Sequence, residues 1–416
     1  MDEALRGDAE AIVRQAIAAC LPTQGVVRTL KGMRFAGRVY VVAVGKAAWP
    51  MAQAAVTVLP PVSGGLVITK HGHSQGPIAG LTVREAGHPV PDAASLAAAD
   101  EALAMVEGLT AGDTVVFLLS GGASALFEKP LVPLAQLQDV TGQLLACGAD
   151  IRQVNIIRKR LSAVKAGRFA LACQPARVVN VILSDVLGDE LDAIGSGPTV
   201  PDATTAGQAL DIVARFGLRL PASLLDLLAR PTPARLDNVE SHVIGSVGLL
   251  CQAALEACAR RGYQPTLVTD RLSGPADQAG LDMARRLRQV QGTGRRLALV
   301  AGGETVVTLT GQGLGGRNQH LALAACQKLS GLDGVGLISV GSDGTDGPTD
   351  AAGGYVDGRT ADLLAAAGWD AAAALRDDDS YHALAMTGGL VITGPTGTNV
   401  NDIVVGLVRP ADDGAI

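Results

Sequence analysis

Two cationic side chains are placed where a strand pattern runs into a helix pattern, each with glycine beside it. In VVAVGKAAWPMA, Lys46 follows a β-branched run and Gly45, and in TLTGQGLGGRNQHLALA, Arg317 follows a glycine-rich loop. A cation at a helix N-terminus opposes the helix dipole, whereas an anion bound there is stabilised by the amides and by the cation. The alternative for each residue is an exposed, solvated side chain. The two positions therefore predict binding of an anion such as a phosphate.

A third candidate is the glycine turn after the apolar run TVVFLL. Two consecutive glycines let the backbone aim successive N–H groups at one point, with two serine hydroxyls nearby. Such a turn suits a carboxylate or a phosphate. The alternative is an ordinary strand-to-helix turn with serine as the N-cap. The residues that we expect to bind substrate are Ser120, Gly121, Gly122, Ala123 and Ser124.

The loop before Arg317 has a second interpretation. Gly311, Gly313 and Gly316 show the G-x-G-x-x-G spacing between a strand and a helix, so a dinucleotide-binding fold is a rival. The acidic residue which that fingerprint requires comes late, at Asp343. Arg317 could bridge phosphates with two parallel hydrogen bonds. The residues expected to bind nucleotide are Gly313, Gly315, Gly316, Asn318 and Glu304.

Acidic residues follow two of the strand patterns. Phosphoryl transfer needs a divalent metal, held in part by carboxylates. Asp185 and Asp189 follow one strand, and we expect one of them to orient a hydroxyl group or act as the base. Asp343 and Asp346 follow another strand among glycines and are the expected metal contacts. The alternative for all four is an Asx turn. His88, which precedes a proline, could line a cleft or cap a turn, and we expect it in a turn.

Composition excludes several classes of protein. The net charge is -6 and aromatic residues make up 3% of the 416 residues, which argues against a nucleic-acid binder. No uncharged run approaches the roughly 18 apolar residues of a membrane-spanning helix. The first residues, MDEALRGDAE, lack the apolar region of a secretory signal. We expect a globular protein of the cytoplasm that does not bind membranes.

Short β-branched runs alternate with longer Ala/Leu-rich stretches, which predicts an α/β fold with largely parallel sheets and helices on both faces. Three prolines between 217 and 238 mark a boundary, so we expect a Rossmann-like domain at 1–237 and a second α/β domain at 238–416. The strands are expected at 39–44, 66–69, 114–119, 178–184, 242–247, 266–269, 297–301, 305–310, 335–340, 390–393 and 403–408.

Taken together, the motifs resemble the glycerate 2-kinase family, whose C-terminal part is called the MOFRL domain. They are VVAVGKAAWPMA, LLSGGASAL, NIIRKRLSAVKAGRFA, SDVLGDELDAIGSGPTVPD, AGGETVVTLTGQGLGGRNQHLALA, SVGSDGTDGPTDAAGG and TGPTGTNVNDIVVGL, and they span nearly the whole chain. The resemblance implies phosphorylation of the 2-hydroxyl of D-glycerate by ATP with Mg²⁺. It also implies that Lys46 and Arg317 are essential. His320 departs from the family pattern, where we expect Glu.

The resemblance implies an active site in a cleft between the two domains, with glycerate on 120–124 and the two cations on the transferred phosphoryl group. Relatives named hydroxypyruvate reductase supply a rival, an NAD(P)H-dependent reductase whose nicotinamide nucleotide would use the 311–316 loop. A sensor that binds sugar acids without turnover is a second rival. The oligomeric state stays open, with a homodimer as one alternative.

Overall fold

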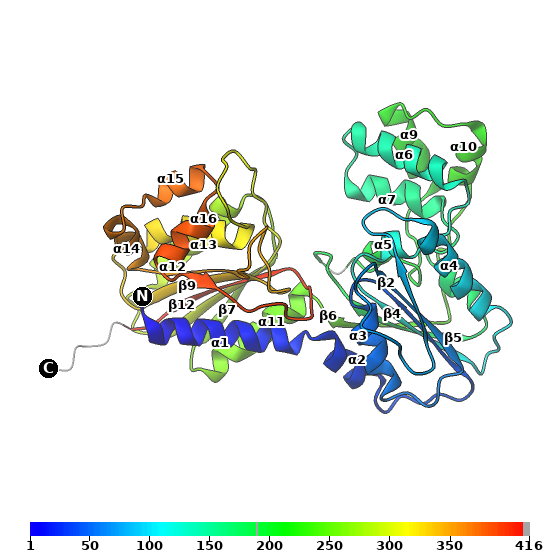
Figure 1. Cartoon of the computed structure of the whole chain (residues 1–416), viewed down its shortest axis with the longest axis horizontal. Coiled ribbons are helices and arrows are strands. Elements are labelled where there is room, and N and C mark those ends of the chain that lie inside the picture. The colour runs from blue at the N-terminus through cyan, green and yellow to red at the C-terminus, as the bar shows by residue number, and fades with distance from the viewer. Residues whose placement is uncertain (189, 411–416) are drawn as a thin grey trace. The chain divides into compact units, whose positions relative to one another are not determined.

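The computed structural model describes residues 1–188 and 190–410, which form two compact units. The N-terminal unit consists of Pro22–Ser184 and Glu190–Ile244. The C-terminal unit consists of Met1–Leu21, the described part of 185–189 and the chain from Gly245 onward. Each unit contains one six-stranded sheet with helices packed against it (Figure 1). The α/β fold class is therefore confirmed. The expected boundary between 237 and 238 differs from these units, because Met1–Leu21 packs with the C-terminal unit and the chain as far as Ile244 belongs to the N-terminal unit.

The sheet of the N-terminal unit has the strand order β3-β2-β1-β4-β5-β6, and the pairs β3–β2, β2–β1, β1–β4 and β4–β5 are parallel, as expected. The strands are β1 (Val39–Val44), β2 (Gly64–Lys70), β3 (Thr82–Ala86), β4 (Thr114–Leu119), β5 (Arg177–Leu183) and β6 (Val239–Gly245). The helices are α2 (Pro22–Leu30), α3 (Ala48–Val56), α4 (Ala93–Val106), α5 (Ala123–Leu126), α6 (Leu134–Ala146), α7 (Ile151–Arg160), α8 (Arg168–Ala172), α9 (Ala206–Phe216), α10 (Ala222–Ala229) and the 3-10 turn Ile194–Ser196.

This strand order has a functional consequence. The chain moves outward from β1 to β2 and β3, and then returns to place β4 on the other side of β1. The connections after β1 and β4 therefore leave the sheet in opposite directions. In open parallel sheets, ligands bind in the crevice that this reversal creates at the carboxyl ends of the strands. Lys46 and the 120–124 turn follow those two strands.

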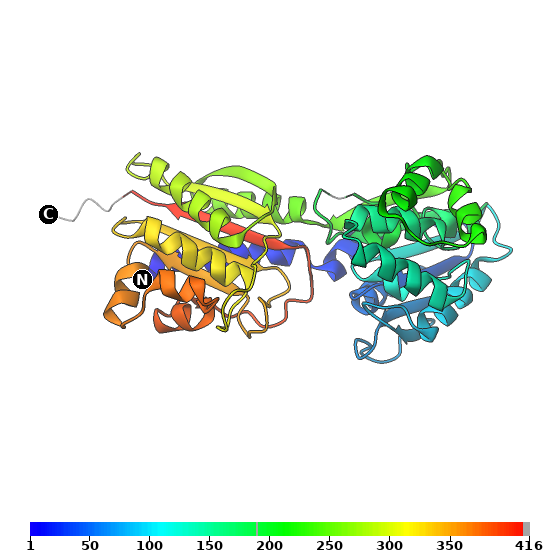
Figure 2. The same ribbon diagram turned by 90° about the horizontal axis from the view of Figure 1, so that it is seen from above.

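A separate cluster of helices completes the N-terminal unit. Helices α6, α7, α9 and α10 are grouped together in both views (Figure 1, Figure 2) and bury their own apolar core, which includes Leu144, Ile157 and Leu228. Asp150 and Thr205 begin α7 and α9 with reciprocal capping hydrogen bonds. Such caps satisfy helix amides that would otherwise lack partners.

The sheet of the C-terminal unit differs from the expected parallel arrangement. Its order is β11-β10-β9-β12-β8-β7, and only β7–β8 pair in parallel, since β12 and β10 run antiparallel to both of their neighbours. The strands are β7 (Gln264–Leu272), β8 (Leu297–Gly303), β9 (Val335–Gly341), β10 (Gly353–Asp357), β11 (Leu390–Val391) and β12 (Asp402–Val408). The sequence did not reveal this because a fully buried strand such as β12 is a continuous apolar run in either direction.

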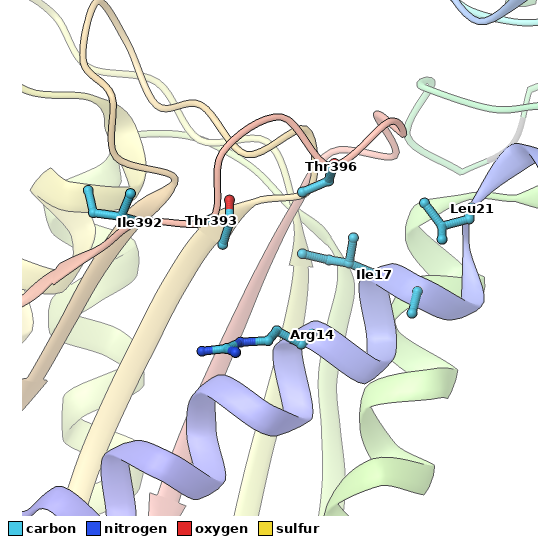
Figure 3. A pocket seen from close by; sticks show the side chains of 7 residues that line it. Arg14, Ile17, Leu21, Ile392, Thr393 and Thr396 are labelled. Carbon is cyan, nitrogen blue, oxygen red and sulfur yellow. The ribbon is translucent and has the colours of Figure 1, made fainter. Parts of the chain in front are cut away.

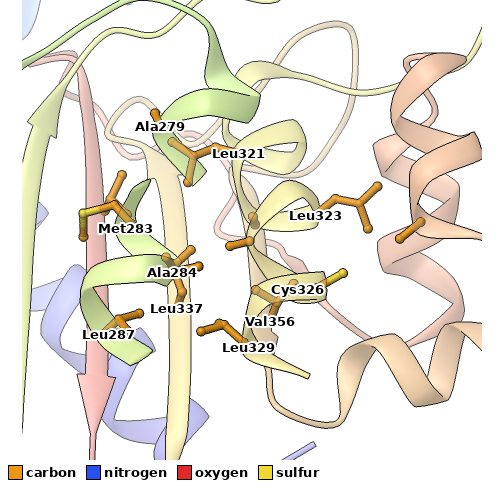
Figure 4. Close-up of a cluster of buried hydrophobic side chains, with 14 of the residues drawn as sticks. Ala279, Met283, Ala284, Leu287, Leu321, Leu323, Cys326, Leu329, Leu337 and Val356 are labelled. Atoms are coloured by element: carbon orange, nitrogen blue, oxygen red, sulfur yellow. The ribbon is translucent and has the colours of Figure 1, made fainter. Parts of the chain in front are cut away.

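The same unit has three layers. Helices α1 and α11 pack on one face of the sheet, and α12 and α13 pack side by side on the other (Figure 1). Met283 and Leu287 of α12 meet Leu321 and Leu329 of α13 in the core above the sheet (Figure 4). The helices are α1 (Glu3–Ala19), α11 (Val247–Arg260), α12 (Ala276–Val290), α13 (Arg317–Leu329), α14 (Thr360–Ala366), α15 (Ala371–Arg376) and α16 (Ser380–Met386).

One strand prediction is wrong, and two strands were not predicted. The segment 305–310 is not a strand, since only Val306 forms a bridge, to Pro275, and the segment is largely exposed. Strands β3 and β10 were not predicted, because TVREA is polar and GGYVD begins with two glycines.

Among the helices that the structure describes, none has the length and apolar character needed to cross a bilayer.

Candidate functional site

Lys46 lies in the turn between β1 and α3, at the reversal point of the N-terminal sheet. Its amide donates to the carbonyl of Gly121 (2.9 Å), and the amide of Ala47 donates to the hydroxyl of Ser120 (3.0 Å). Gly45 has a φ of 125°, and a Cβ there would lie 2.5 Å from the Ser120 carbonyl oxygen. The turns after β1 and β4 are therefore joined by hydrogen bonds, and the structure brings Lys46 and the predicted 120–124 turn together.

The side chain of Lys46 is exposed and has no carboxylate partner among the residues that the structure describes. It passes over Gly122, whose φ is 87°, and a Cβ at Gly122 would lie 3.3 Å from Cγ of Lys46. The same Cβ would lie 3.2 Å from Nε2 of His88. His88 is in a bend, as expected, but its ring also reaches the candidate site. Lys46 and His88 thus converge on one glycine.

Ser124 is held by a residue that sequence reasoning missed. Its hydroxyl lies 3.0 Å from the hydroxyl of Ser196, and its carbonyl accepts from Arg158 (3.2 Å). Ser196 is fully buried and has a φ of 62°, which is unusual for a residue other than glycine. Backbone conformations of this kind cost free energy and often occur at functional sites. The signal in the sequence was the G-S-G triplet around Ser196.

In the C-terminal unit, Arg317 is the first residue of α13 and binds two carboxylates. Its Nε and Nη2 donate to the two oxygens of Asp402 (2.6 and 3.0 Å), and its Nη1 donates to Glu304 (2.6 Å). Burial disfavours the charge on Arg317, but the hydrogen bonds and the attraction to Asp402 raise its pKa above the ordinary value. Burial raises the pKa of Asp402 to about 6. Sequence reasoning found Arg317 and Glu304 but missed Asp402.

Asn401 connects this cluster to the predicted Asp185. Its Nδ2 donates to Glu304 (3.2 Å) and to the backbone carbonyl of Asp185 (3.1 Å). Asn401 is buried and has a φ of 68°. The structure therefore places the backbone of Asp185 in the Arg317 cluster. Asp189, the alternative to Asp185, lies outside the described residues.

The predicted metal contacts have partners within the protein. Asp346 is buried and accepts from the amides of Asn318 (3.1 Å) and Gln319 (2.8 Å), so its carboxylate occupies the N-terminus of α13. Burial raises its pKa. Asp343 accepts from the amide of Thr345 (3.0 Å), which is an Asx turn. Within residues 1–188 and 190–410, no three His, Cys, Asp or Glu side chains form a group that could hold a metal ion.

The glycine-rich loop before Arg317 contacts three consecutive aspartates. The carboxylate of Asp378 accepts from the amides of Thr310 and Gly311 (both 2.7 Å). The loop amides that follow donate to Asp377 and Asp379. A Cβ at Gly311 would lie 2.2 Å from the backbone of Asp377, so glycine is required for this close approach. The spacing of the glycines is therefore explained by packing against 377–380.

His320, which departs from the family pattern, is the next residue along the same face of α13 after Arg317. It lines a cavity of about 230 Å³ together with Val306, Thr310 and Asp378. Burial lowers the pKa of His320, so its ring is neutral near pH 7.

A different cavity, of about 330 Å³, lies between Arg14 and Ile17 of α1 and Thr393 (Figure 3). None of the predicted site residues lines that second cavity.

Comparison with known proteins agrees with these features. A family model described as "Domain of unknown function (DUF4147)" matches residues 8–229, and one described as "MOFRL family" matches residues 297–402. A protein of Thermotoga maritima named D-glycerate 2-kinase is 48% identical over 98% of this chain and 99% of its own length. A solved structure of a glycerate kinase from Thermotoga maritima matches with a TM-score of 0.94 and covers 98% of this chain and 100% of that chain.

One relative has a different name. A protein of Agrobacterium vitis, provisionally named a hydroxypyruvate reductase, is 39% identical over 93% of this chain and 91% of its own length. The two names therefore occur within one family of full-length relatives. The order of the motifs, the two α/β units and the match to a solved glycerate kinase lead to one conclusion. This chain belongs to the glycerate 2-kinase family, whose members contain the MOFRL domain.

Proposed function

We propose that this protein transfers the γ-phosphoryl group of ATP to the 2-hydroxyl of D-glycerate and produces 2-phospho-D-glycerate. The observation that carries the proposal is the placement of Lys46 at the reversal point of the N-terminal sheet, without a carboxylate partner among the described residues. Parallel sheets bind ligands at that position. The similarity to proteins named glycerate kinase supplies the substrate.

Glycerate is a carboxylate, and the turn 120–124 offers groups that can bind it. Gly121 and Gly122 expose backbone next to the Lys46 side chain, and the hydroxyl of Ser124 is fixed by Ser196. A cation beside backbone amides strengthens binding of an anion. In this proposal, the carboxylate of glycerate binds to the 120–124 turn while Lys46 neutralises charge on the transferred phosphoryl group.

Arg317 is the second cation of the proposal. It would neutralise negative charge on the phosphoryl group, which supplies much of the rate in phosphoryl transfer. Asp402 and Glu304 fix its guanidinium group before any ligand arrives. The prediction that Lys46 and Arg317 act on the same phosphoryl group, in a site to which both units contribute, stays a prediction, as does the role of Asp185 or Asp189.

The nucleotide contacts also stay predictions. The geometry limits which groups could make them. The amide of Gly313 donates to Asp377, and that of Asn318 donates to Asp346. Phosphate bound beside this loop would therefore have to contact side chains such as Arg317 rather than these two amides. Mg²⁺ usually keeps several waters and takes only one or two carboxylates together with substrate phosphates.

The reductase is the rival to be tested. A dinucleotide fold places its pyrophosphate on the glycine-loop amides at the helix N-terminus. Here Asp346 accepts from the first amides of α13, and Asp377 to Asp379 accept from the loop. Carboxylates at these amides would repel a pyrophosphate. The same carboxylates would repel ATP phosphates at these amides, so the kinase is favoured by the relatives named glycerate kinase rather than by this loop.

One pair of assays decides between the two activities. Purified protein is given ATP, Mg²⁺ and D-glycerate, ADP formation is followed by a coupled assay, and the product is identified as 2- or 3-phosphoglycerate. The same protein is given hydroxypyruvate and NADH or NADPH, and absorbance is followed. We expect 2-phosphoglycerate in the first assay and no oxidation of NADH in the second. Turnover in the second assay without turnover in the first would refute the proposal, and binding of glycerate without turnover would indicate a sensor.

A further inference from the structure

His88 is the candidate that the mechanism above does not use. It lies two residues beyond β3, at the sheet edge where Lys46 and the 120–124 turn are also found. A Cβ at Gly122 would lie 3.0 Å from Cδ2 and 3.2 Å from Nε2 of His88. The edge of the imidazole ring that carries Nε2 therefore faces the turn proposed to bind glycerate, with Lys46 beside it.

The ring nitrogens of His88 are free of protein partners in the described part of the chain. Two other histidines differ in this respect. His71 pairs with Asp92 at 2.8 Å, and His242 pairs with Glu240 at 2.8 Å. A half-buried imidazole without a hydrogen bond to protein is available to bond a ligand, because buried polar groups are normally satisfied.

The surroundings of His88 keep its ring neutral. Partial burial lowers its pKa, and the positive charges of Lys46, Lys70 and His73 lower it further. Lys46 comes from the turn after β1, Lys70 ends β2, and His73 follows β2. At neutral pH, one ring nitrogen therefore carries a lone pair that can accept a proton. This is the state required of a general base.

We propose that Nε2 of His88 accepts the proton of the 2-hydroxyl of glycerate during phosphoryl transfer, an inference that rests on the function proposed above. The hydroxyl oxygen forms a bond to the γ-phosphorus of ATP as its proton passes to Nε2. The bond between the γ-phosphorus and the bridging oxygen breaks, and its electron pair leaves with ADP. His88 then releases the proton to solvent. In this reaction Asp185 is not the base.

The test compares His88→Gln with the matched control His71→Gln, which lies at the same sheet edge but pairs with Asp92. Both variants are checked for folding by circular dichroism and thermal unfolding. Values of kcat and KM for D-glycerate are measured with saturating ATP and Mg²⁺ from pH 5.5 to 9. We expect kcat of His88→Gln to fall on the order of 100-fold with KM changed only a few fold. His71→Gln should match the wild type.

The pH profile distinguishes a base from a structural role. For the wild type, kcat/KM should fall on the acid side with a pKa below 6.5, because His88 becomes protonated there. This acid limb should disappear in His88→Gln. Retention of the limb, or a kcat within about threefold of wild type, overturns the role of His88. If Asp185→Asn instead abolishes the limb, Asp185 is the base.

A second measurement follows His88 in the wild type and uses a variant only to assign its signal. The imidazole signals of the wild type are followed by NMR with isotope-labelled histidine, and His88→Asn or His88→Gln assigns the signal. We expect a pKa below 6.5 and a shift of this signal on addition of D-glycerate. A signal that does not respond to saturating D-glycerate refutes the proposal. A wild type that phosphorylates no glycerate refutes the proposed function together with this role, whereas an active wild type with an equally active His88→Gln refutes only the role of His88.

Discussion

Lys46 and Arg317 occupy similar local positions but have opposite surroundings. Each follows a glycine and lies at or just before the start of a helix, although Lys46 comes soon after β1 and Arg317 follows the long loop after β8. Lys46 is exposed, with no carboxylate partner in the described residues, next to a glycine turn that offers backbone and hydroxyl groups. Arg317 binds Asp402 and Glu304, and the loop before it donates its amides to aspartates. The comparison shows that Lys46 is open to an anionic ligand, whereas carboxylates of the protein already bind Arg317.

This difference has an electrostatic meaning. An uncompensated lysine attracts an anion from solvent, whereas the two carboxylates around Arg317 hold its guanidinium group in one orientation and weaken its attraction for a further anion. We therefore expect Lys46 to act mainly in the capture of anionic ligands and in neutralising phosphoryl charge. Arg317 should act as a preoriented group whose position depends on Asp402. The predictions below separate these two behaviours.

The largest effects are expected for the two cations themselves. Lys46→Ala and Arg317→Ala should each lower kcat on the order of 1000-fold, because each removes charge that stabilises the transferred phosphoryl group. Their stabilities should differ. Arg317→Ala leaves Asp402 buried without its partner and should lose about 3 kcal/mol of the free energy of unfolding. Lys46→Ala should stay within about 0.5 kcal/mol of wild type.

Kinetic assays and urea unfolding measure both quantities for each variant. Arg317→Lys is the conservative control, and we expect it to recover stability in part but little activity, since lysine cannot form the two parallel bonds to Asp402. Near-wild-type turnover in either alanine variant contradicts the assignment. Equal losses of stability in both would remove the difference between the two positions.

The N-terminal unit also contains a buried cation held by a carboxylate. Lys165 and Glu128 are both fully buried and 2.6 Å apart, and burial lowers the pKa of Lys165 to about 8. Lys165→Met should cost about 3–5 kcal/mol, because it leaves Glu128 buried and unpaired. The double variant Lys165→Met/Glu128→Leu should recover most of this loss. Denaturant unfolding of the two variants checks the prediction, and a double variant as unstable as the single one would contradict it.

A smaller effect is expected for the aspartates beneath the glycine loop. Asp378→Ala leaves the amides of Thr310 and Gly311 without their acceptor, and we expect a loss of about 1–3 kcal/mol. Hydrogen exchange of 305–316 should become faster in this variant. Asp377→Ala, which removes the acceptor of one amide only, is the matched control. Unchanged exchange in Asp378→Ala would mean that the loop is held by other contacts.

The smallest effect is a dependence of stability on pH. The pKa of Asp402 is raised by burial to about 6, above its ordinary value of 3.8. A carboxyl whose pKa is higher in the folded state contributes stability that is complete below the unfolded pKa and is lost as pH rises through the folded pKa. The wild type should therefore lose stability between about pH 4 and pH 6 relative to Asp402→Asn. Urea unfolding of both proteins at several pH values in this range measures the difference.

Much of the candidate site could be predicted because its signals are local. Lys46, the 120–124 turn, Arg317 and Glu304 lie next to strand ends or helix starts, and in the parallel sheet of the N-terminal unit the strand ends that carry Lys46 and the turn meet at one edge. His88, Ser196, Asn401 and Asp402 were missed because each comes from a segment distant in sequence from the group that it contacts. The contacts of Asp377 to Asp379 with the glycine loop are of the same kind. The hydrophobic periodicity of the sequence carries no information about contacts between such distant segments.

The sequence by itself determined the α/β class, the positions of most strands, and the two cations after glycine turns, because these depend on the hydrophobic period and on backbone preferences of neighbouring residues. Only the tertiary structure decided the direction of β12 and β10, since an apolar run pairs equally well in both directions. It also decided which cation is paired. Charges interact through space, so the freedom of Lys46 and the pairing of Arg317 follow from the folding of distant segments rather than from the local sequence around either residue.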